Sequence, residues 1–346
     1  MHIAVNTLPA AGIPFPHHVV RYLSQVLERI QREKPSLRFS CLHLRETPNP
    51  FPTLSGIESA AVESGLRARL SGSDSLDGLL KKQRVDLVIS PLQTALPRTQ
   101  LPQVLLALDL ALWEDRQQSA PAPKDVKRTC AAAKNIIVPT EHLRRQCLER
   151  FEAPMERIVV APPGVTPGLG EASQSMVEKP YVVLFYDPLT APLLATIRAA
   201  LEKRKDEFRF TQVIVGPELP EEPAQWGPGV VRIEQCPANH LAGLYQEAAF
   251  FLYPAPHDGS GLRVLEALAT GVPVLAAGAR GVSEVAGDAP IYFNGESLDA
   301  FFQSLKRVLS EDGQSRGKRI HTGKQIASRY DWEKTMWKVL ATLKTN

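Results

Sequence analysis

Long hydrophobic runs are missing from this chain of 346 residues, and no stretch approaches the roughly 20 apolar residues that a membrane-spanning helix needs. The chain begins with the strand-like MHIAVNTL, which lacks the basic region and apolar segment of a secretory signal. A net charge of +3 is too small to indicate nucleic-acid binding, although a mildly basic surface suits anionic lipid or phosphorylated ligands. We therefore expect a cytoplasmic protein without a nucleic-acid partner. Peripheral contact with the inner face of a membrane stays open.

Cysteine is scarce, and the few thiols are widely separated. No pair has the spacing of a metal site or of a redox motif. The simplest interpretation is four free thiols in a reducing compartment, with no metal centre. These residues are Cys41, Cys130, Cys147 and Cys236.

The chain is longer than a usual single core, which predicts two domains. Strand-like and helix-like patterns alternate as far as Ala161, stop in a segment rich in proline, glycine and small polar residues, and resume at Tyr181. This alternation predicts an α/β protein with two doubly wound parallel sheets, each binding ligands at the carboxyl ends of its strands. The expected parts are a first domain (1–165), a linker (166–179), a second domain (180–328) and a final helix (329–346) that returns to the first domain.

The clearest functional pattern lies in residues 250–284. An apolar run at 250–253 predicts a strand, the turn DGSG at 258–261 follows, and a helical pattern leads to a second strand. Bare backbone N–H groups at the start of such a helix can receive an anion such as phosphate. Glu266 lies one turn inside, on the face away from the leucines, where we expect it to meet sugar hydroxyls.

This stretch resembles the nucleotide-sugar motif of the retaining GT-B glycosyltransferases of family four. That motif usually reads E-G-F-G-L-P-x-L-E and continues A-x-A-x-G-x-P-V; here DGSGLRVLE occupies the same frame at 258–266. KNIIVPT at 134–140 and the segment 156–165 resemble further family sequences, so the resemblance covers most of the chain. It implies the GT-B fold, in which two Rossmann-like domains face each other across a cleft.

The resemblance also implies a donor site in the second domain. Glu266 would bind the ribose hydroxyls of a nucleotide sugar. Asp258 stands where the family has a glutamate near the transferred sugar. It is either a catalytic carboxylate that stabilises positive charge or a turn-forming residue. Glu284 is expected to order its loop. The backbone that would face the donor sugar and diphosphate belongs to Gly259, Ser260, Gly261 and Leu262.

The chain departs from the family where the donor diphosphate is neutralised. An arginine and a lysine usually follow the first strand of the second domain, but here that strand continues as FYDPLTA, with Asp187 adding a negative charge. Arg263 and Arg280 are the only cations beside the glycine turn. Either could replace the missing pair; Arg280 is expected to contact the donor, whereas Arg263 is interpreted as an exposed surface arginine.

The first domain departs from the family as well. Many members carry a His-Asp pair after a first-domain strand, where this chain has Leu108-Asp109-Leu110 without the histidine. The first loop contains one glycine in place of the usual two. Capping or structural roles stay open for these residues. The candidates for the acceptor side are Gly12, His17, His18 and Asp109.

The resemblance implies a glycosyltransferase that moves a sugar from a nucleotide-sugar donor to a saccharide or lipid-linked acceptor. Anomeric configuration would be retained, with no metal and no cofactor besides the donor substrate. The missing cations favour an alternative, a weakened or inactive GT-B-like protein that serves as a partner or regulatory subunit. A nucleotide-sugar epimerase is a third hypothesis, but no acid/base pair for it can be identified.

Overall fold

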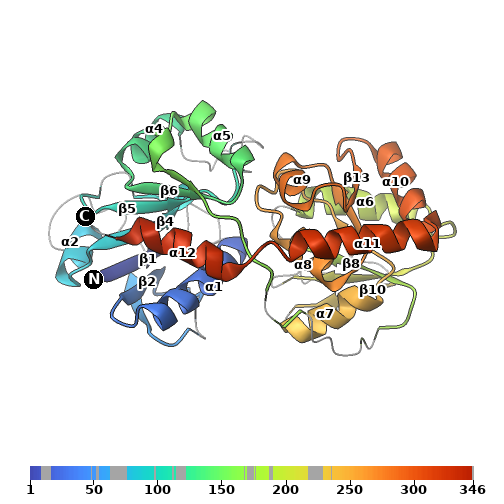
Figure 1. Cartoon of the computed structure of the whole chain (residues 1–346), viewed down its shortest axis with the longest axis horizontal. Helices are drawn as coiled ribbons and strands as arrows, with labels where there is room; N and C mark the ends of the chain where they lie inside the picture. The colour runs from blue at the N-terminus through green and yellow to red at the C-terminus, as the bar shows by residue number, and fades with distance from the viewer. Residues whose placement is uncertain are drawn as a thin grey trace. The chain divides into compact units, whose positions relative to one another are not determined.

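The structure, a computed structural model, divides the chain into two compact units (Figure 1). The first comprises Met1–Pro163 together with Trp332–Asn346, and the second comprises Gly164–Asp331. The residues described are 1–344 except 9–16, 48, 52–53, 63–75, 97–98, 111–112, 114–121, 167, 170–174, 176, 187–189, 217–228 and 235.

The first unit contains a seven-stranded sheet in the order β3-β2-β1-β4-β5-β6-β7, with every pair parallel. Its central strands are buried along their whole length, as is typical of a parallel sheet covered on both faces. The strands are β1 (His2–Asn6), β2 (Arg38–Leu44), β3 (Ile57–Val62), β4 (Leu87–Pro91), β5 (Gln103–Leu106), β6 (Asn135–Val138) and β7 (Ile158–Val160).

The helices of the first unit place apolar side chains against this sheet. One core cluster joins Leu80 to β1, β2 and β4, and another joins Cys130 and Cys147 to β5 and β6. Thr140 caps its helix by accepting a hydrogen bond from the Leu143 N–H, as its sequence position predicts. The helices are α1 (His17–Glu33), α2 (Leu76–Lys82), α4 (Pro123–Ala132), α5 (Glu141–Phe151) and α12 (Trp332–Leu343).

The last helix, α12, packs against α1 (Figure 1). The Trp332 and Tyr22 rings meet edge to face with centroids 5.5 Å apart, and the Tyr22 hydroxyl donates to the Ala161 carbonyl. The apolar stripe expected from the sequence, with Met336 and Val339 among its members, is buried. The final helix therefore completes the core of the first unit.

The second unit contains a six-stranded parallel sheet in the order β10-β9-β8-β11-β12-β13. The two parallel, doubly wound sheets confirm the predicted α/β class. The strands are β8 (Tyr181–Phe185), β9 (Thr211–Val215), β10 (Val230–Ile233), β11 (Phe251–Tyr253), β12 (Val274–Ala277) and β13 (Ile291–Phe293).

Alternate residues of β8 belong to two different core clusters, one on each face of the second sheet. Val183 and Phe185 pack with helices α7, α8, α9 and α11, whereas Val182 and Leu184 pack with α6 and α10. The helices are α6 (Ala191–Glu202), α7 (Ala238–Glu247), α8 (Leu262–Thr270), α9 (Arg280–Ala286), α10 (Leu298–Ser310) and α11 (Gly313–Ala327).

The polypeptide passes between the units twice, after Pro163 and after Asp331. Inside the second unit the two connecting segments are joined, because the Val165 N–H donates to the Tyr330 carbonyl at 3.3 Å. The second unit is thus inserted into the first in the order of the sequence.

Two edge strands, β3 and β13, do not appear in the sequence-based assignment. In β3 only Ala60 and Val62 are buried, so its apolar alternation is short and composed partly of alanine. The other strand, β13, has three residues and precedes a long helical region. Edge strands carry a weaker pattern because fewer of their side chains face a core.

Candidate functional site

The direction in which strands are added reverses between β8 and β11 in the second sheet. From β8 the chain proceeds outward through β9 and β10, then returns to β11 and proceeds the other way. In open α/β sheets such a reversal leaves a crevice at the carboxyl ends of the two strands, where ligands bind. The glycine turn at 258–261 follows β11, so it belongs to this end of the sheet.

Asp258 is the centre of the turn. One of its carboxylate oxygens accepts from the Ser260 N–H at 2.8 Å and the Ser260 hydroxyl at 2.9 Å, and the other accepts from the Gly261 N–H at 3.0 Å and the Tyr253 hydroxyl at 3.2 Å. The side chain is buried. This geometry is the turn-forming role that the sequence left open for Asp258.

The same contacts correct the expectation of bare backbone donors at this turn. The N–H groups of Ser260 and Gly261 already bind Asp258, and the Leu262 N–H donates to the Ser260 hydroxyl at 3.3 Å. A short polar side chain competes for the donors of a helix start, as Asp and Ser commonly do. An anion that binds the N–H groups of Ser260, Gly261 and Leu262 must therefore displace these side-chain oxygens.

Two glycines make this packing possible. Gly261 has φ +63°, and a Cβ there would lie 2.2 Å from Val285 Cγ2. A Cβ on Gly281 would lie 2.7 Å from the Cα and carbonyl oxygen of Gly259. The turn is consequently held against α9 by direct backbone contact, which only glycine permits.

Glu266 is fully buried, which the sequence did not predict. Its Oε1 accepts from the Thr166 hydroxyl, and Oε2 lies 3.4 Å from Arg263 Nη1. A buried carboxylate needs such partners because desolvating an unpaired charge is expensive. In this structure Thr166 and Arg263 contact the Glu266 carboxylate, and its binding of sugar hydroxyls stays a prediction.

Arg263 is more buried than the sequence analysis predicted. Its guanidinium carbon lies 3.9 Å from the ring centroid of Phe185, the last residue of β8, and only 16% of its side chain is exposed. The interpretation of Arg263 as an exposed surface arginine is wrong. This stacking, on the face of the sheet that α8 covers, holds the positive charge at the end of β8, the strand after which the family's cations are missing.

The remaining donor-side candidates lie at or near the same turn. Leu262 begins α8 and is buried. Arg280 begins α9 and is exposed, and Glu284 is exposed on the same helix. Burial and the nearby Glu284 carboxylate raise the pKa of Tyr330, which places Glu284 close to the second connecting segment. Asp187 lies outside the described residues.

The first sheet reverses between β1 and β4, and its polar residues gather at the carboxyl ends of these strands. Asn6 ends β1 and is buried, with its amide nitrogen donating to the Thr94 carbonyl at 2.8 Å and the Ser90 hydroxyl at 3.3 Å. A histidine and a carboxylate that are distant in the sequence also form a contact: His18 Nε2 lies 2.6 Å from Asp109 Oδ2.

The pairing of His18 with Asp109 joins two candidates that the sequence treated separately. His18 lies in the first turn of α1 and Asp109 three residues after β5, and their side chains are 18% and 8% exposed. A carboxylate that binds one imidazole nitrogen fixes the ring and stabilises its protonated form. His17 is the first residue of α1, and Gly12 lies outside the described residues.

The thiols do not form a site. Burial raises the pKa of Cys41 to about 11 and that of Cys130 to about 12, so both remain protonated and unreactive near neutral pH. All four cysteines are free. Within the described ranges, no group of three or more His, Cys, Asp or Glu is arranged to hold a metal ion, and no helix there is long and apolar enough to span a membrane.

Comparison with known proteins shows which proteins the chain is similar to. Residues 190–311 match the profile of the family described as glycosyl transferases group 1. The O-antigen chain mannosyltransferase B of Escherichia coli is 32% identical over 99 residues, covering 28% of this chain and 25% of that protein. The D-inositol 3-phosphate glycosyltransferase of Salinispora tropica is 27% identical over 281 residues, covering 68% and 57%. The chain spans 24–62% of the length of the curated relatives it matches.

Solved structures resemble the chain along its whole length. The Anabaena protein HepE in complex with UDP and glucose superposes with a TM-score of 0.73 at 16% identity, covering 99% of both chains. WaaG, a glycosyltransferase involved in lipopolysaccharide biosynthesis, gives 0.70 at 15% identity and full coverage of both chains. The chain therefore has the GT-B fold, and its residues 190–311 match the glycosyl transferases group 1 profile.

Proposed function

We propose that this protein is a glycosyltransferase that takes a nucleotide-sugar donor in its second unit. The observation that carries the proposal is the joint placement of the glycine turn, Arg263 and Glu266 at the reversal between β8 and β11, inside the matched segment. The acceptor is a saccharide or a lipid-linked saccharide. The relative named O-antigen chain mannosyltransferase B supports an acceptor of this kind.

Arg263 supplies positive charge for the donor diphosphate in this proposal. Its stacking on Phe185 holds the guanidinium beside the end of β8, and its planar fork suits paired phosphate oxygens. Exposed Arg280, at the start of α9, adds a second cation. The lack of an arginine and lysine after β8 favoured an inactive partner protein when judged from sequence, and Arg263 removes that reason.

Glu266 binds the ribose hydroxyls after an exchange of partners. The Thr166 hydroxyl now donates to Glu266, and a ribose hydroxyl can replace it with a hydrogen bond of the same type. When the diphosphate draws Arg263 away, Glu266 Oε2 loses its contact with Arg263 and can accept from the other ribose hydroxyl. Donor binding therefore couples the two residues, and Asp258 keeps the turn in shape beneath them.

The chemistry follows from positioning and charge. Transfer with retention proceeds through a state with positive charge at the anomeric carbon and a departing diphosphate. Arg263 and Arg280 stabilise the diphosphate without a metal ion. His18, held by Asp109, is the candidate to contact an acceptor hydroxyl in the first unit.

Calorimetric titration tests the donor site. We expect the wild-type protein to bind UDP, because the HepE structure contains UDP, with GDP and ADP as comparisons. Glu266→Gln removes the carboxylate but keeps the shape, and we expect about a tenfold or greater loss of UDP affinity. Glu202→Gln, an exposed change on α6, serves as the matched control. Absence of binding by every nucleotide and nucleotide sugar would falsify the proposal.

Product analysis tests the reaction class. With a bound donor identified, the anomeric configuration of the product is read by NMR, and we expect it to match that of the donor. Turnover in the presence of a chelator is expected to equal turnover with added magnesium. A product of inverted anomeric configuration would contradict retention. Transfer that stops when a chelator is added would contradict metal independence.

A further inference from the structure

One face of α12 remains at the surface after the helix has completed the core of the first unit. Its exposed residues recur at helical spacing, and Trp337 is 51% exposed, an unusual position for so large an apolar side chain. No acidic residue interrupts this face between Lys334 and Lys344. We call it the α12 surface, formed by Lys334, Trp337, Lys338, Ala341 and Lys344.

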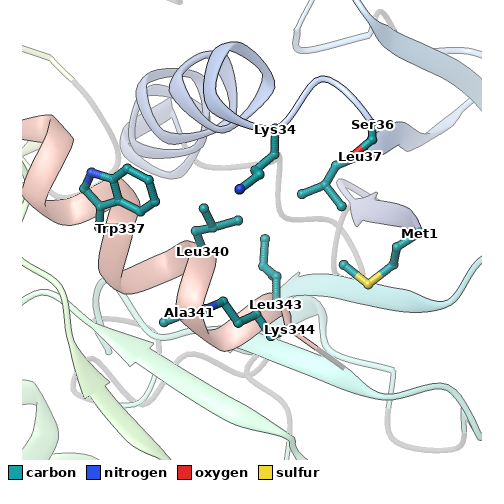
Figure 2. Close-up of a pocket in the computed structure, with 9 residues that line it drawn as sticks. All are labelled: Met1, Lys34, Ser36, Leu37, Trp337, Leu340, Ala341, Leu343 and Lys344. Atoms are coloured by element: carbon teal, nitrogen blue, oxygen red, sulfur yellow. The ribbon is translucent and has the colours of Figure 1, made fainter. Parts of the chain in front are cut away.

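A pocket of about 490 Å³ adjoins the α12 surface, between α12 and the end of α1 (Figure 2). Its apolar lining includes Leu37, Leu340 and Leu343. Figure 2 shows Lys34 extending from α1 toward α12, with Trp337 at one side and Lys344 at the end of α12. The pocket thus combines an apolar lining with two lysines, Lys34 and Lys344.

Among the residues that the structure describes, no ion pair includes Lys34, Lys334, Lys338 or Lys344. Glu333 lies within ion-pair distance of both Arg29 and Arg32, so its charge is already compensated. The pocket lining contains two lysines and no acidic residue. Lys338 donates to the Val160 carbonyl, a contact that leaves its positive charge uncompensated.

We propose that the α12 surface and its pocket dock on a membrane surface that contains anionic phospholipid. Tryptophan prefers the boundary between headgroups and acyl chains, and lysines flanking it contact lipid phosphates while their stems lie along apolar surface. A helix with a lysine-rich outer face and an aromatic anchor lies in the plane of that boundary. The pocket accepts the apolar part of one lipid. The inference does not depend on the donor chemistry of the second unit.

Sedimentation of the whole chain with vesicles tests the proposal. We expect binding to vesicles of phosphatidylcholine mixed with phosphatidylglycerol, little binding to phosphatidylcholine alone, and weakening as salt is raised. The double variant Lys334→Glu with Lys344→Glu is expected to bind more than about 25-fold more weakly, since each lysine near an anionic surface contributes roughly fivefold and each glutamate adds repulsion. Lys81→Glu with Lys82→Glu, which makes the same charge change at exposed sites on α2, is the control.

A second variant separates the contribution of the Trp337 side chain to membrane binding from that of the lysine charges. Trp337→Ala is expected to reduce vesicle binding at fixed salt. The fluorescence of Trp337 itself is obtained by subtracting the emission spectrum of Trp337→Phe from that of the wild type, and this difference spectrum is expected to shift to shorter wavelength on vesicle binding. Equal loss in the α2 control, or equal binding to neutral and anionic vesicles, would overturn the proposal. Dimers that disappear in Trp337→Ala, together with no vesicle binding, would assign the surface to a second copy and overturn it too.

Discussion

The Arg263 guanidinium makes two contacts: it stacks on the face of the Phe185 ring and lies within ion-pair distance of the Glu266 carboxylate. If it holds the donor diphosphate, Arg263→Gln should weaken UDP binding about 10- to 100-fold, the range for a lost hydrogen bond to a charged group. Uridine binding should change little, because uridine has no phosphate. Calorimetry with both ligands gives the comparison.

Arg204 provides a matched control for that experiment. It too stacks at 3.9 Å on a phenylalanine ring, that of Phe302, but it follows α6 and does not adjoin the turn. Arg204→Gln should leave UDP affinity unchanged. Similar losses of UDP and uridine affinity in Arg263→Gln would mean that the arginine only supports the fold.

His18 and Asp109 make the second prediction at the scale of residues. If the pair acts on a reacting hydroxyl, His18→Gln should lower kcat about 100-fold, a typical loss for a group that assists proton transfer, while the dissociation constant for UDP stays the same. Asp109→Asn should produce a similar loss, because residues that act as a unit are not additive. His321→Gln on α11 is the control, and unchanged kcat in both variants would assign the pair to structure.

The contacts that define the candidate site could not be predicted from sequence, although its location could. The frame of DGSGLRVLE placed the turn and Glu266 in the right unit. The partner of Glu266, Thr166, is 100 positions away, and that of His18 is 91 positions away. No local pattern encodes such pairs, since they depend on how the sheet brings its loops together. Arg263 was misjudged for the same reason.

At the scale of elements, the contact between α9 and the glycine turn gives a test of packing. Gly281→Ala would place a methyl group 2.7 Å from Gly259, where only backbone atoms can move. We expect a loss of about 1–3 kcal/mol in the free energy of unfolding, with weaker donor binding. Denaturant titration and calorimetry measure the two effects.

Gly317→Ala, within α11, is the control for that substitution. A Cβ at Gly317 meets nothing within 4 Å, so alanine should stabilise the helix by about 0.5–1 kcal/mol. If Gly281→Ala proves equally harmless, the turn does not rely on close approach of α9.

The elements themselves were largely predictable, because buried parallel strands and amphipathic helices have strong periodic patterns. The strand β8 and the helix α12 appear where the sequence placed them. Predictions failed where the pattern was weak, at the edge strands β3 and β13. They also shifted at β5, which ends at Leu106 and leaves Asp109 in the following segment.

At the scale of the whole molecule, two separate cores predict two unfolding transitions. Trp332→Ala should destabilise the first unit by about 3–5 kcal/mol, since the ring is buried against Tyr22. Phe301→Ala should do the same to the second unit, where Phe301 is buried against Phe293 and Phe302. Denaturant titration should show each variant lowering a different midpoint. One transition that shifts equally in both variants would contradict independent cores.

The return of α12 to the first unit sets an order of events on the ribosome. Residues 164–331 leave the ribosome, and can complete their own core, before Trp332 has been translated. The first unit begins earlier but must wait, with the face of α1 that receives α12 uncovered, until the last helix emerges. The part of the protein made first is therefore the part finished last, and a nascent chain halted before residue 332 would carry a complete second unit and an incomplete first unit.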